Sequence, residues 1–196
     1  MNINENKNPI AFFKKWLVEA EAIEPLNSNA MALATSGPDN RPSVRMVLLK
    51  EVDDRGFVFY SNAESRKGLE IEANAYASLC FYWKSLGRQV RIDGVVTQVS
   101  DQDADIYFDS RHLRARVGAW ASAQSRPMRG RFDLEKNVAK YAAKFKDGPV
   151  PRPDYWRGYR VAPDAIEFWI EQESRLHDRY VYQRDNDGWN IVRLFP

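Results

Sequence analysis

Short runs of alternating apolar and polar residues cover most of the chain, and turn-forming residues separate the runs. Alternation with a period of two is typical of half-buried strands. The runs predict strands at Ala30–Thr35, Ser43–Leu49, Phe57–Tyr60, Ala77–Trp83, Gln89–Val99, Tyr159–Val161, Ile166–Trp169, Arg179–Arg184 and Trp189–Leu194. Turn residues at Gly37–Asn40, Asp53–Gly56 and Asp185–Gly188 join neighbouring runs, which predicts hairpins and an antiparallel meander.

Helical periodicity occurs in fewer segments. The predicted helices are Pro9–Ala22, a helix capped by Ser65 that ends near Ala73, a helix that Ser100 and Asp103 open and that ends near Phe108, and Asp133–Phe145. The stretch Arg111–Arg131 is small, polar and basic, and we expect it to be partly helical. Strands joined mostly by hairpins, with a few helices, predict a mainly β fold: a closed or nearly closed antiparallel barrel with peripheral helices.

The composition excludes several classes of protein. The 196 residues carry 29 Lys and Arg against 27 Asp and Glu, a net charge of +2, so binding of nucleic acid through bulk charge is not expected. One Cys and two His make a disulfide framework or a zinc site improbable, and we predict no metal. No apolar run is long enough to span a bilayer, and the first residues do not resemble a secretion signal. We therefore expect a cytoplasmic protein with no membrane partner.

Cationic residues gather at positions that stability alone does not explain. Arg66 and Lys67 follow Ser65 at a predicted helix start, where they oppose the helix dipole unless an anion binds there. Arg45 and Lys50 lie at the two ends of a buried-looking run, roughly 16 Å apart in a regular strand, so they would serve two anionic groups. In each case the alternative is a charged segment that reaches solvent.

Two further motifs carry polar chemistry. In an extended Arg175–Arg179 segment, Arg175, His177 and Arg179 share one side, which favours an anion or an electron-rich ring above them and a neutral imidazole. Tyr107 and Arg111, four residues apart, could hold a phosphate at a helix end. Hydrolytic triads, HExxH and the phosphate-binding glycine motifs are missing from the sequence, which favours a protein that positions a reactive cofactor.

Several motifs, in a fixed order, then give the chain a family likeness. They are RMVLLK (Arg45–Lys50), YSN with SRK (Tyr60–Lys67), RQV with Gln89, YFxSR (Tyr107–Arg111), GAWxSxQS (Gly118–Ser125), IEFW (Ile166–Trp169), RLHDR (Arg175–Arg179) and a closing RLFP. With them the chain resembles the pyridoxine (pyridoxamine) 5′-phosphate oxidase family over about Ala30–Pro196. The resemblance implies an FMN-binding split β-barrel at 25–196 that includes a C-terminal dimerisation region, an N-terminal helical segment at 1–24, and a homodimer with flavin at its interface.

The resemblance also implies the roles of individual residues. One subunit would hold FMN through Arg45, Met46, Val47, Leu48, Leu49, Lys50, Tyr60, Ser61, Arg66, Lys67 and Gln89, and the other through Gln124, Ser125, Trp169 and Arg179. Lys50, Tyr107 and Arg111 would bind the phosphate of the vitamin substrate, and Arg175, Leu176 and His177 would lie at its pyridine ring, with Arg175 and His177 as the catalytic pair.

The implied reaction is the oxidation of pyridoxamine or pyridoxine 5′-phosphate to pyridoxal 5′-phosphate, with hydride transfer from C4′ to flavin N5 and reoxidation by O2 to H2O2. Ala115 stands where the family usually carries a Ser that binds the substrate phosphate, and Arg114 or Arg116 would have to compensate. Two alternatives therefore stay open: a related flavin oxidase that acts on another ring, as in the phenazine pathway, and a non-catalytic protein that binds flavin or pyridoxal phosphate.

Overall fold

The computed structural model describes residues 7–24, 26–186 and 188–196. Its strands are β1 (Ala30–Ser36), β2 (Pro42–Leu48), β3 (Glu51–Asp53), β4 (Gly56–Asn62), β5 (Tyr76–Trp83), β6 (Arg88–Gln98), β7 (Trp156–Ile170), β8 (Asp178–Asp185) and β9 (Gly188–Leu194). Its helices are α1 (Pro9–Ile23), α2 (Arg66–Ala73), α3 (Asp101–Ser110), α4 (Leu113–Ala121) and α5 (Asp133–Lys144), with short 3-10 turns η2 (Lys84–Leu86) and η3 (Glu173–Arg175).

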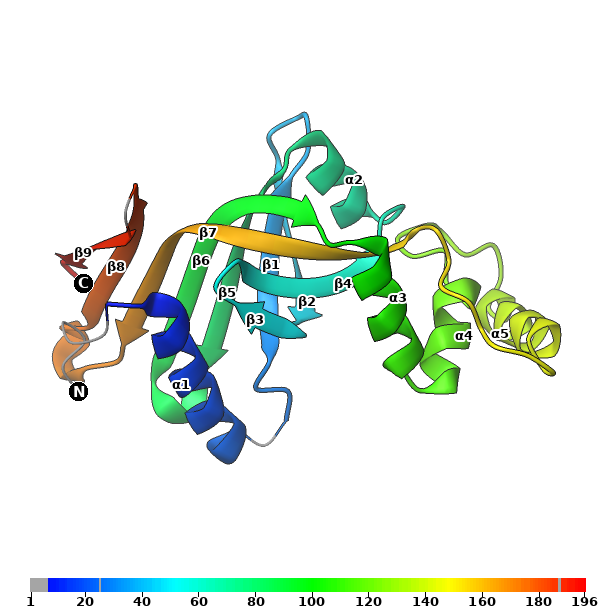
Figure 1. Ribbon diagram of the computed structural model, residues 1–196, viewed down its shortest axis with the longest axis horizontal. Helices are drawn as coiled ribbons and strands as arrows, with labels where there is room; N and C mark the ends of the chain where they lie inside the picture. Colours follow the sequence, from blue (N-terminus) through cyan, green and yellow to red (C-terminus); the bar gives the residue numbers. More distant parts are fainter. Residues whose placement is uncertain (1–6, 25, 187) are drawn as a thin grey trace.

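The described strands form one antiparallel sheet in the order β2-β1-β5-β6-β7-β4-β3, and β8 and β9 extend it from the second half of β7. The sheet curls into a half-barrel, and the helices lie around it (Figure 1). The prediction of a mainly β, antiparallel fold with peripheral helices is thus confirmed. No helix within the described ranges is long and apolar enough to cross a membrane.

The long strand β7 corrects one prediction. Tyr159–Val161 and Ile166–Trp169, which were expected to be separate strands, belong to this single strand and pair with β6 along its length. Pro163 interrupts the apolar alternation, and it faces a register shift between Asp93 and Gly94. A bulge tolerates the missing proline N–H, so the strand bends there and continues.

Gly94 permits the close approach of the β6 and β7 backbones at this bulge. A Cβ at this position would lie 2.0 Å from the backbone oxygen of Ala162, a distance that no side chain tolerates. The turn predicted at Asp185–Gly188 does join β8 to β9, where Asp185 pairs with Gly188, although Asp187 lies outside the described residues.

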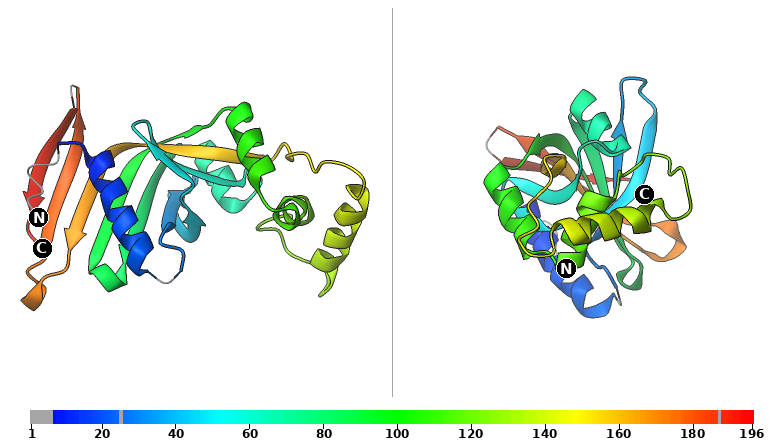
Figure 2. Two further views of the ribbon diagram at one scale, coloured as in Figure 1. Left: turned by 60° about the horizontal axis from the view of Figure 1, so that its bottom comes forward. Right: turned by 90° about the vertical axis from the view of Figure 1, so that its right-hand side faces the viewer.

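The core fills the inside of the curved sheet, and α1 closes it (Figure 2). Asn8 caps this helix by accepting hydrogen bonds from the N–H groups of Ile10 (2.9 Å) and Ala11 (3.1 Å). Phe13 is fully buried and contacts the rings of Phe57, Phe81 and Trp83 at 4.9, 5.0 and 5.9 Å. One helical face thus joins β4 and β5.

Strand β7 also runs between the two ends of the molecule. Helices α3, α4 and α5 gather beyond its first residues, and β8 and β9 lie at its last residues (Figures 1 and 2). The side chain of Arg152 ties the segment before β7 to α3, because it donates to Asp105 (2.6 Å) and Asp101 (2.9 Å). About eleven residues separate Gly158 from Trp169, which corresponds to roughly 35 Å of strand.

We predict that Phe13→Ala lowers the free energy of unfolding by about 3–5 kcal/mol, because it leaves a cavity among three aromatic rings. Val18→Ala on the same helix, where the side chain is 64% exposed, should change it by less than about 0.5 kcal/mol. Denaturant unfolding of both variants at one protein concentration measures the difference. Equal effects would contradict the assignment of α1 to the core.

Candidate active site

A cluster of cations surrounds the start of α2. Ser65 precedes the helix as predicted, yet its hydroxyl does not cap it: it donates to the Asn62 carbonyl (2.6 Å) and accepts from Lys67 Nζ (2.9 Å). Lys67 Nζ also donates to Gln124 Oε1 (2.8 Å), which lies after α4. This contact joins α2 to the loop that follows α4.

Lys67 has an unusual protonation equilibrium. Burial and the nearby guanidinium of Arg45 lower its pKa to about 8, although Glu70 acts in the opposite direction. Because the amine is charged below this pH and neutral above it, the cluster attracts an anion most strongly below pH 8.

Glu70 is the acidic member of the cluster. Its Oε2 accepts from Thr35 Oγ1 (2.6 Å), Ser43 Oγ (2.5 Å) and Arg45 Nη2 (3.1 Å), and its Oε1 accepts from Arg66 Nε (2.8 Å). Burial alone would raise the pKa of this carboxyl, but the hydrogen bonds from Ser43, Thr35, Arg66 and Arg45 lower it to about 2. The Glu70 carboxyl is therefore ionised at neutral pH.

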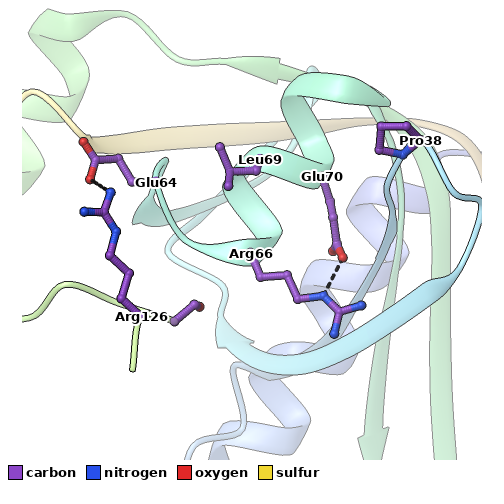
Figure 3. Close-up of a pocket in the computed structure, with 7 residues that line it drawn as sticks. Pro38, Glu64, Arg66, Leu69, Glu70 and Arg126 are labelled. Atoms are coloured by element: carbon purple, nitrogen blue, oxygen red, sulfur yellow. Dashed lines mark hydrogen bonds and ion pairs between the residues drawn. The ribbon is translucent and has the colours of Figure 1, made fainter. Parts of the chain in front are cut away.

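The cluster opens into a cavity of about 580 Å³ (Figure 3). Its lining comes from the β1–β2 turn, α2 and the loop after α4: Pro38, Glu64, Arg66, Leu69, Glu70, Ser125 and Arg126. An ion pair between Arg126 Nη2 and Glu64 Oε2 (2.6 Å) joins the segment before α2 to the loop after α4. Both side chains are more than half exposed, so this pair contributes little stability.

A second cavity of about 380 Å³ lies beside α4, and its lining joins β4, α4 and the start of β7. The lining residues are Tyr60, Ser61, Asn62, Arg111, Ala115, Gly118, Ala119, Ser122, Gln124 and Trp156. Ala115 contributes no hydroxyl here, and neither Arg114 nor Arg116 is among these lining residues.

Arg111 is the cation of this second cavity. Its guanidinium lies 4.9 Å from the ring centre of Trp156 and 5.5 Å from that of Phe108, and burial lowers its pKa. Its buried Nη1 has no hydrogen-bond partner within the described part of the chain. A buried donor without a partner is costly, and an anion in the cavity would remove that cost.

Aromatic rings build the wall next to Arg111. Tyr60 stacks on Tyr107 at 4.2 Å and on Trp156 at 5.0 Å. The three residues come from β4, α3 and β7, so the stack fixes Tyr107 and Arg111 against the sheet. Of the predicted pair, Arg111 lines the cavity, and Tyr107 stacks on the lining residue Tyr60.

A third group of polar side chains lies at the other end of β7. Gln89, Trp169 and Arg179 occupy one row across β6, β7 and β8. Arg179 Nε donates to Glu167 Oε1 (2.8 Å), and its Nη1 donates to the carbonyl of Phe195 (3.1 Å). The chain end is thereby held against β8.

His177 lies beside this row. Its ring centre is 4.6 Å from that of Trp169, and its Nδ1 accepts from the backbone N–H of Gln172 (3.2 Å). In the neutral imidazole the proton is then on Nε2, which makes this atom a hydrogen-bond donor. Arg175 precedes it with a φ of +62°, and Ser174 with +54°, so two residues hold the left-handed conformation in this turn.

Two of the predicted cofactor residues lie at different ends of one chain. Gln124 contacts Lys67 after α4. Gln89 pairs with Trp169 at the opposite end of β7. Strand pairing and a loop contact decide these groupings, and the sequence order does not reveal them.

The RMVLLK segment also differs from its prediction as a buried run. It lies on β2, which pairs in this sheet with β1, and its side chains alternate between the two faces. Met46 and Leu48 are exposed, Val47 is half-buried, and Leu49 and Lys50 lie just after the strand, the first buried and the second exposed. The sequence analysis missed Glu70, although its spacing of four residues from Arg66 is a recognisable ion-pair signal.

Comparisons with known proteins show the family of the chain. A family model described as pyridoxamine 5′-phosphate oxidase matches residues 19–145, and one described as the pyridoxine 5′-phosphate oxidase C-terminal dimerisation region matches residues 156–196. Similar relatives are pyridoxine/pyridoxamine 5′-phosphate oxidases from Rhodospirillum rubrum, 55% identical with both chains fully covered, and from Gluconobacter oxydans, 54% identical over 99% of this chain and 97% of the relative.

Two solved structures extend the comparison. PhzG from Burkholderia lata, crystallised with tetrahydrophenazine-1-carboxylic acid, is 33% identical with a TM-score of 0.92 and covers 97% of this chain and 94% of its own. A pyridoxamine 5′-phosphate oxidase-related, FMN-binding protein from Nostoc punctiforme is 18% identical with a TM-score of 0.73, covering 95% and 96%. The second likeness concerns the fold.

We predict that Lys67 titrates with a midpoint of about 8, because burial and Arg45 disfavour its charged form. Acylation of the amine at a series of pH values, read at this residue by mass spectrometry, measures the midpoint. In denaturant the same residue should return to the ordinary value of 10.5. An unchanged midpoint on folding would contradict the buried position of this amine.

Proposed function

Because the chain belongs to the pyridoxamine 5′-phosphate oxidase family, we propose that it oxidises pyridoxamine and pyridoxine 5′-phosphates to pyridoxal 5′-phosphate with bound FMN. One observation carries the proposal: two separate cationic sites, at Lys67 and at Arg111, each suit a phosphate. An enzyme with a phosphorylated cofactor and a phosphorylated substrate needs two such sites. Identity of 55% to an oxidase of this name over the full chain supports the substrate.

The residues present fit FMN. Arg66 lines a cavity large enough for part of a flavin nucleotide, and Lys67 is held next to it by Ser65 and Gln124. These cations would bind the cofactor phosphate. Trp169 and Arg179, at the far end of β7, would reach the cofactor from a second chain.

The length of β7 is the reason for assigning the two ends to different chains. Roughly 35 Å of paired strand separates Gly158 from Trp169, so one chain cannot bring both ends to one flavin ring. A second copy related by two-fold symmetry can supply the missing end to each site, which yields two equivalent sites. The match to a C-terminal dimerisation region supports this homodimer.

The chain would contribute binding, orientation and charge. Arg111 and Tyr107, with Lys50, would hold the substrate phosphate, while Arg175 covers the pyridine ring and His177 donates a hydrogen bond near C4′. When bound, FMN would accept the hydride from C4′ at its N5 and pass the electrons to O2, which gives H2O2.

A second candidate follows from the likeness to PhzG. Its TM-score of 0.92, together with the alanine at position 115, is compatible with a flavin oxidase that acts on a ring without a phosphate. The unpartnered Nη1 of Arg111 does not decide between the two candidates, because a phosphate and the carboxylate of tetrahydrophenazine-1-carboxylic acid are both able to accept from it.

The decisive experiment combines an absorption spectrum with oxygen consumption. We expect a yellow protein that forms pyridoxal 5′-phosphate and consumes O2 when pyridoxamine 5′-phosphate is added in air. Unphosphorylated pyridoxamine should react at least 100-fold less efficiently, since the Arg111 site then lacks its ligand. A preference for tetrahydrophenazine-1-carboxylic acid would favour the second candidate. Bound flavin with no turnover of either B6 phosphate would disprove the proposal.

We also predict that two inactive variants regain catalytic activity when their subunits are mixed. Arg111→Ala and Arg175→Ala alter opposite ends of β7, so a mixed dimer contains one site with neither change. After subunit exchange of an equal mixture, about a quarter of the wild-type activity should return, since half of the dimers are mixed and half of their sites are intact.

The matched control for this rescue mixes Arg111→Ala with Tyr107→Phe, which lie at the same end. Every site of such a mixed dimer carries one change, so the activity should stay at the mean of the two parents. Rescue in both mixtures, or in neither, would show that the two ends of β7 do not meet across a dimer.

A further inference from the structure

Glu70 lies where three elements meet, and no sequence motif assigned it a role. Thr35 of β1, Ser43 of β2 and Arg66 of its own helix all donate to its carboxylate. The residue is 8% exposed, so these donors have little competition from water. A buried carboxylate with this many donors fixes the positions of the groups around it.

The two carboxylate oxygens hold two arginines in different ways. Arg45 donates from Nη1 to the Leu33 carbonyl and Thr35 Oγ1, and from Nη2 to Ser43 Oγ and Glu70 Oε2, which uses four of its five N–H groups. Arg45 is therefore committed to the protein and acts on a ligand mainly through its charge.

Arg66 is held in the opposite manner. Only its Nε donates to Glu70, and the side chain stays 63% exposed at the cavity. Figure 3 shows the guanidinium of Arg66 linked to the carboxylate of Glu70 through Nε. The two terminal nitrogens form no hydrogen bond with the described residues, so both remain available to bind a phosphate in a bidentate manner.

The charges of the cluster also match a phosphate. Arg45, Arg66 and Lys67 carry three positive charges, and Glu70 carries one negative charge, which leaves a net charge of +2. A phosphate monoester carries about −1.5 to −2 at pH 7. With Glu70 ionised, the cluster and its ligand come close to neutrality.

We propose that Glu70 is a positioning residue for the cofactor phosphate, which holds Arg45 against β1 and β2 and aims the terminal nitrogens of Arg66 into the cavity. The inference rests on the proposed function, because it takes the phosphate of FMN as the ligand of this cluster. Glu70 itself touches no ligand and acts through the two arginines.

Glu70→Gln tests this role with little change in shape. A glutamine amide has one oxygen, so it cannot accept from the donors at the Oε2 position and also from Arg66 Nε. We expect the affinity of the flavin-free full-length protein for FMN to fall at least tenfold, while its affinity for riboflavin, which lacks the phosphate, stays within about twofold. Fluorescence titration with each flavin measures both constants.

The matched control is Glu72→Gln, an exposed glutamate on the same helix. It removes the same charge near the cluster without touching Arg45 or Arg66, so the ratio of FMN to riboflavin affinity should remain that of the wild type. An equal loss of affinity for both flavins in Glu70→Gln would mean that Glu70 acts through the fold as a whole and would overturn the proposal. No loss of affinity for either flavin would overturn it as well.

The pH dependence of FMN affinity is a measurement that a purely structural role of Glu70 would not change. The groups facing Lys67 are Arg45 from β2, Glu70 from its own helix, Ser65 before the helix and Gln124 from the loop after α4. Arg45 lowers the pKa of Lys67 and Glu70 raises it. In Glu70→Gln the decline of FMN affinity with rising pH should therefore begin at a lower pH than in the wild type, and an unshifted decline would contradict the proposal.

A double-mutant cycle separates the orientation of the Arg66 side chain from its charge. Arg66→Lys keeps the positive charge but loses the Nε contact and the paired terminal nitrogens, so we expect a loss of FMN over riboflavin similar to that in Glu70→Gln. The double variant should then lose little more than either single variant. Fully additive losses would show that Glu70 does not work through Arg66, and Arg66→Lys alone keeps the test valid if Glu70→Gln fails to fold.

Failure of this inference is distinguishable from failure of the proposed function. If the wild-type protein does not prefer FMN to riboflavin, the cluster is not a flavin phosphate site and the proposed function fails. If the wild type prefers FMN and oxidises pyridoxamine 5′-phosphate while Glu70→Gln keeps that preference, only the role of Glu70 is wrong.

Discussion

The unbroken pairing of β7 with β6 is the constraint on which the rest of the structure depends. Eleven paired positions hold the two strands together, and the bulge at Gly94 bends them without ending the ladder. The first residues of β7 support the helices around Arg111, and its last residues support Trp169 and, through β8, Arg179. A rigid strand thus keeps the two polar ends of one chain apart, and this separation is the basis of the proposal that a second chain completes each site.

Cations without matching carboxylates mark the candidate site. Most arginines of the molecule are neutralised, as Arg160 is by Asp53 and Arg152 by Asp101. Arg111 instead packs against aromatic rings, and the charges around Lys67 exceed those of Glu70. Burying a cation without a full counter-charge costs free energy, and this cost supports the proposal that both sites bind anions.

The sequence predicted the parts of the structure that local patterns control. Alternation predicted most of the strands, and Pro9 and Ser100 stand where helices begin, as expected. Pro163 broke the local pattern of β7, because the bulge that accommodates it depends on the neighbouring strand. Local patterns likewise could not show that Gln124 reaches Lys67 or that Glu70 joins β1 to α2, since these contacts link residues far apart in the sequence.

The helices at one end of the molecule, α3, α4 and α5, have a further consequence for how it moves. No residue of α5 is buried, and its neighbour in space is α4, whereas the strands at the other end lie in a continuous ladder. Regions with few buried contacts open at low free-energy cost, long before the whole chain unfolds. A molecule built in this way can loosen α4, which lines the cavity beside Arg111, and exchange a small ligand there while the sheet keeps its shape.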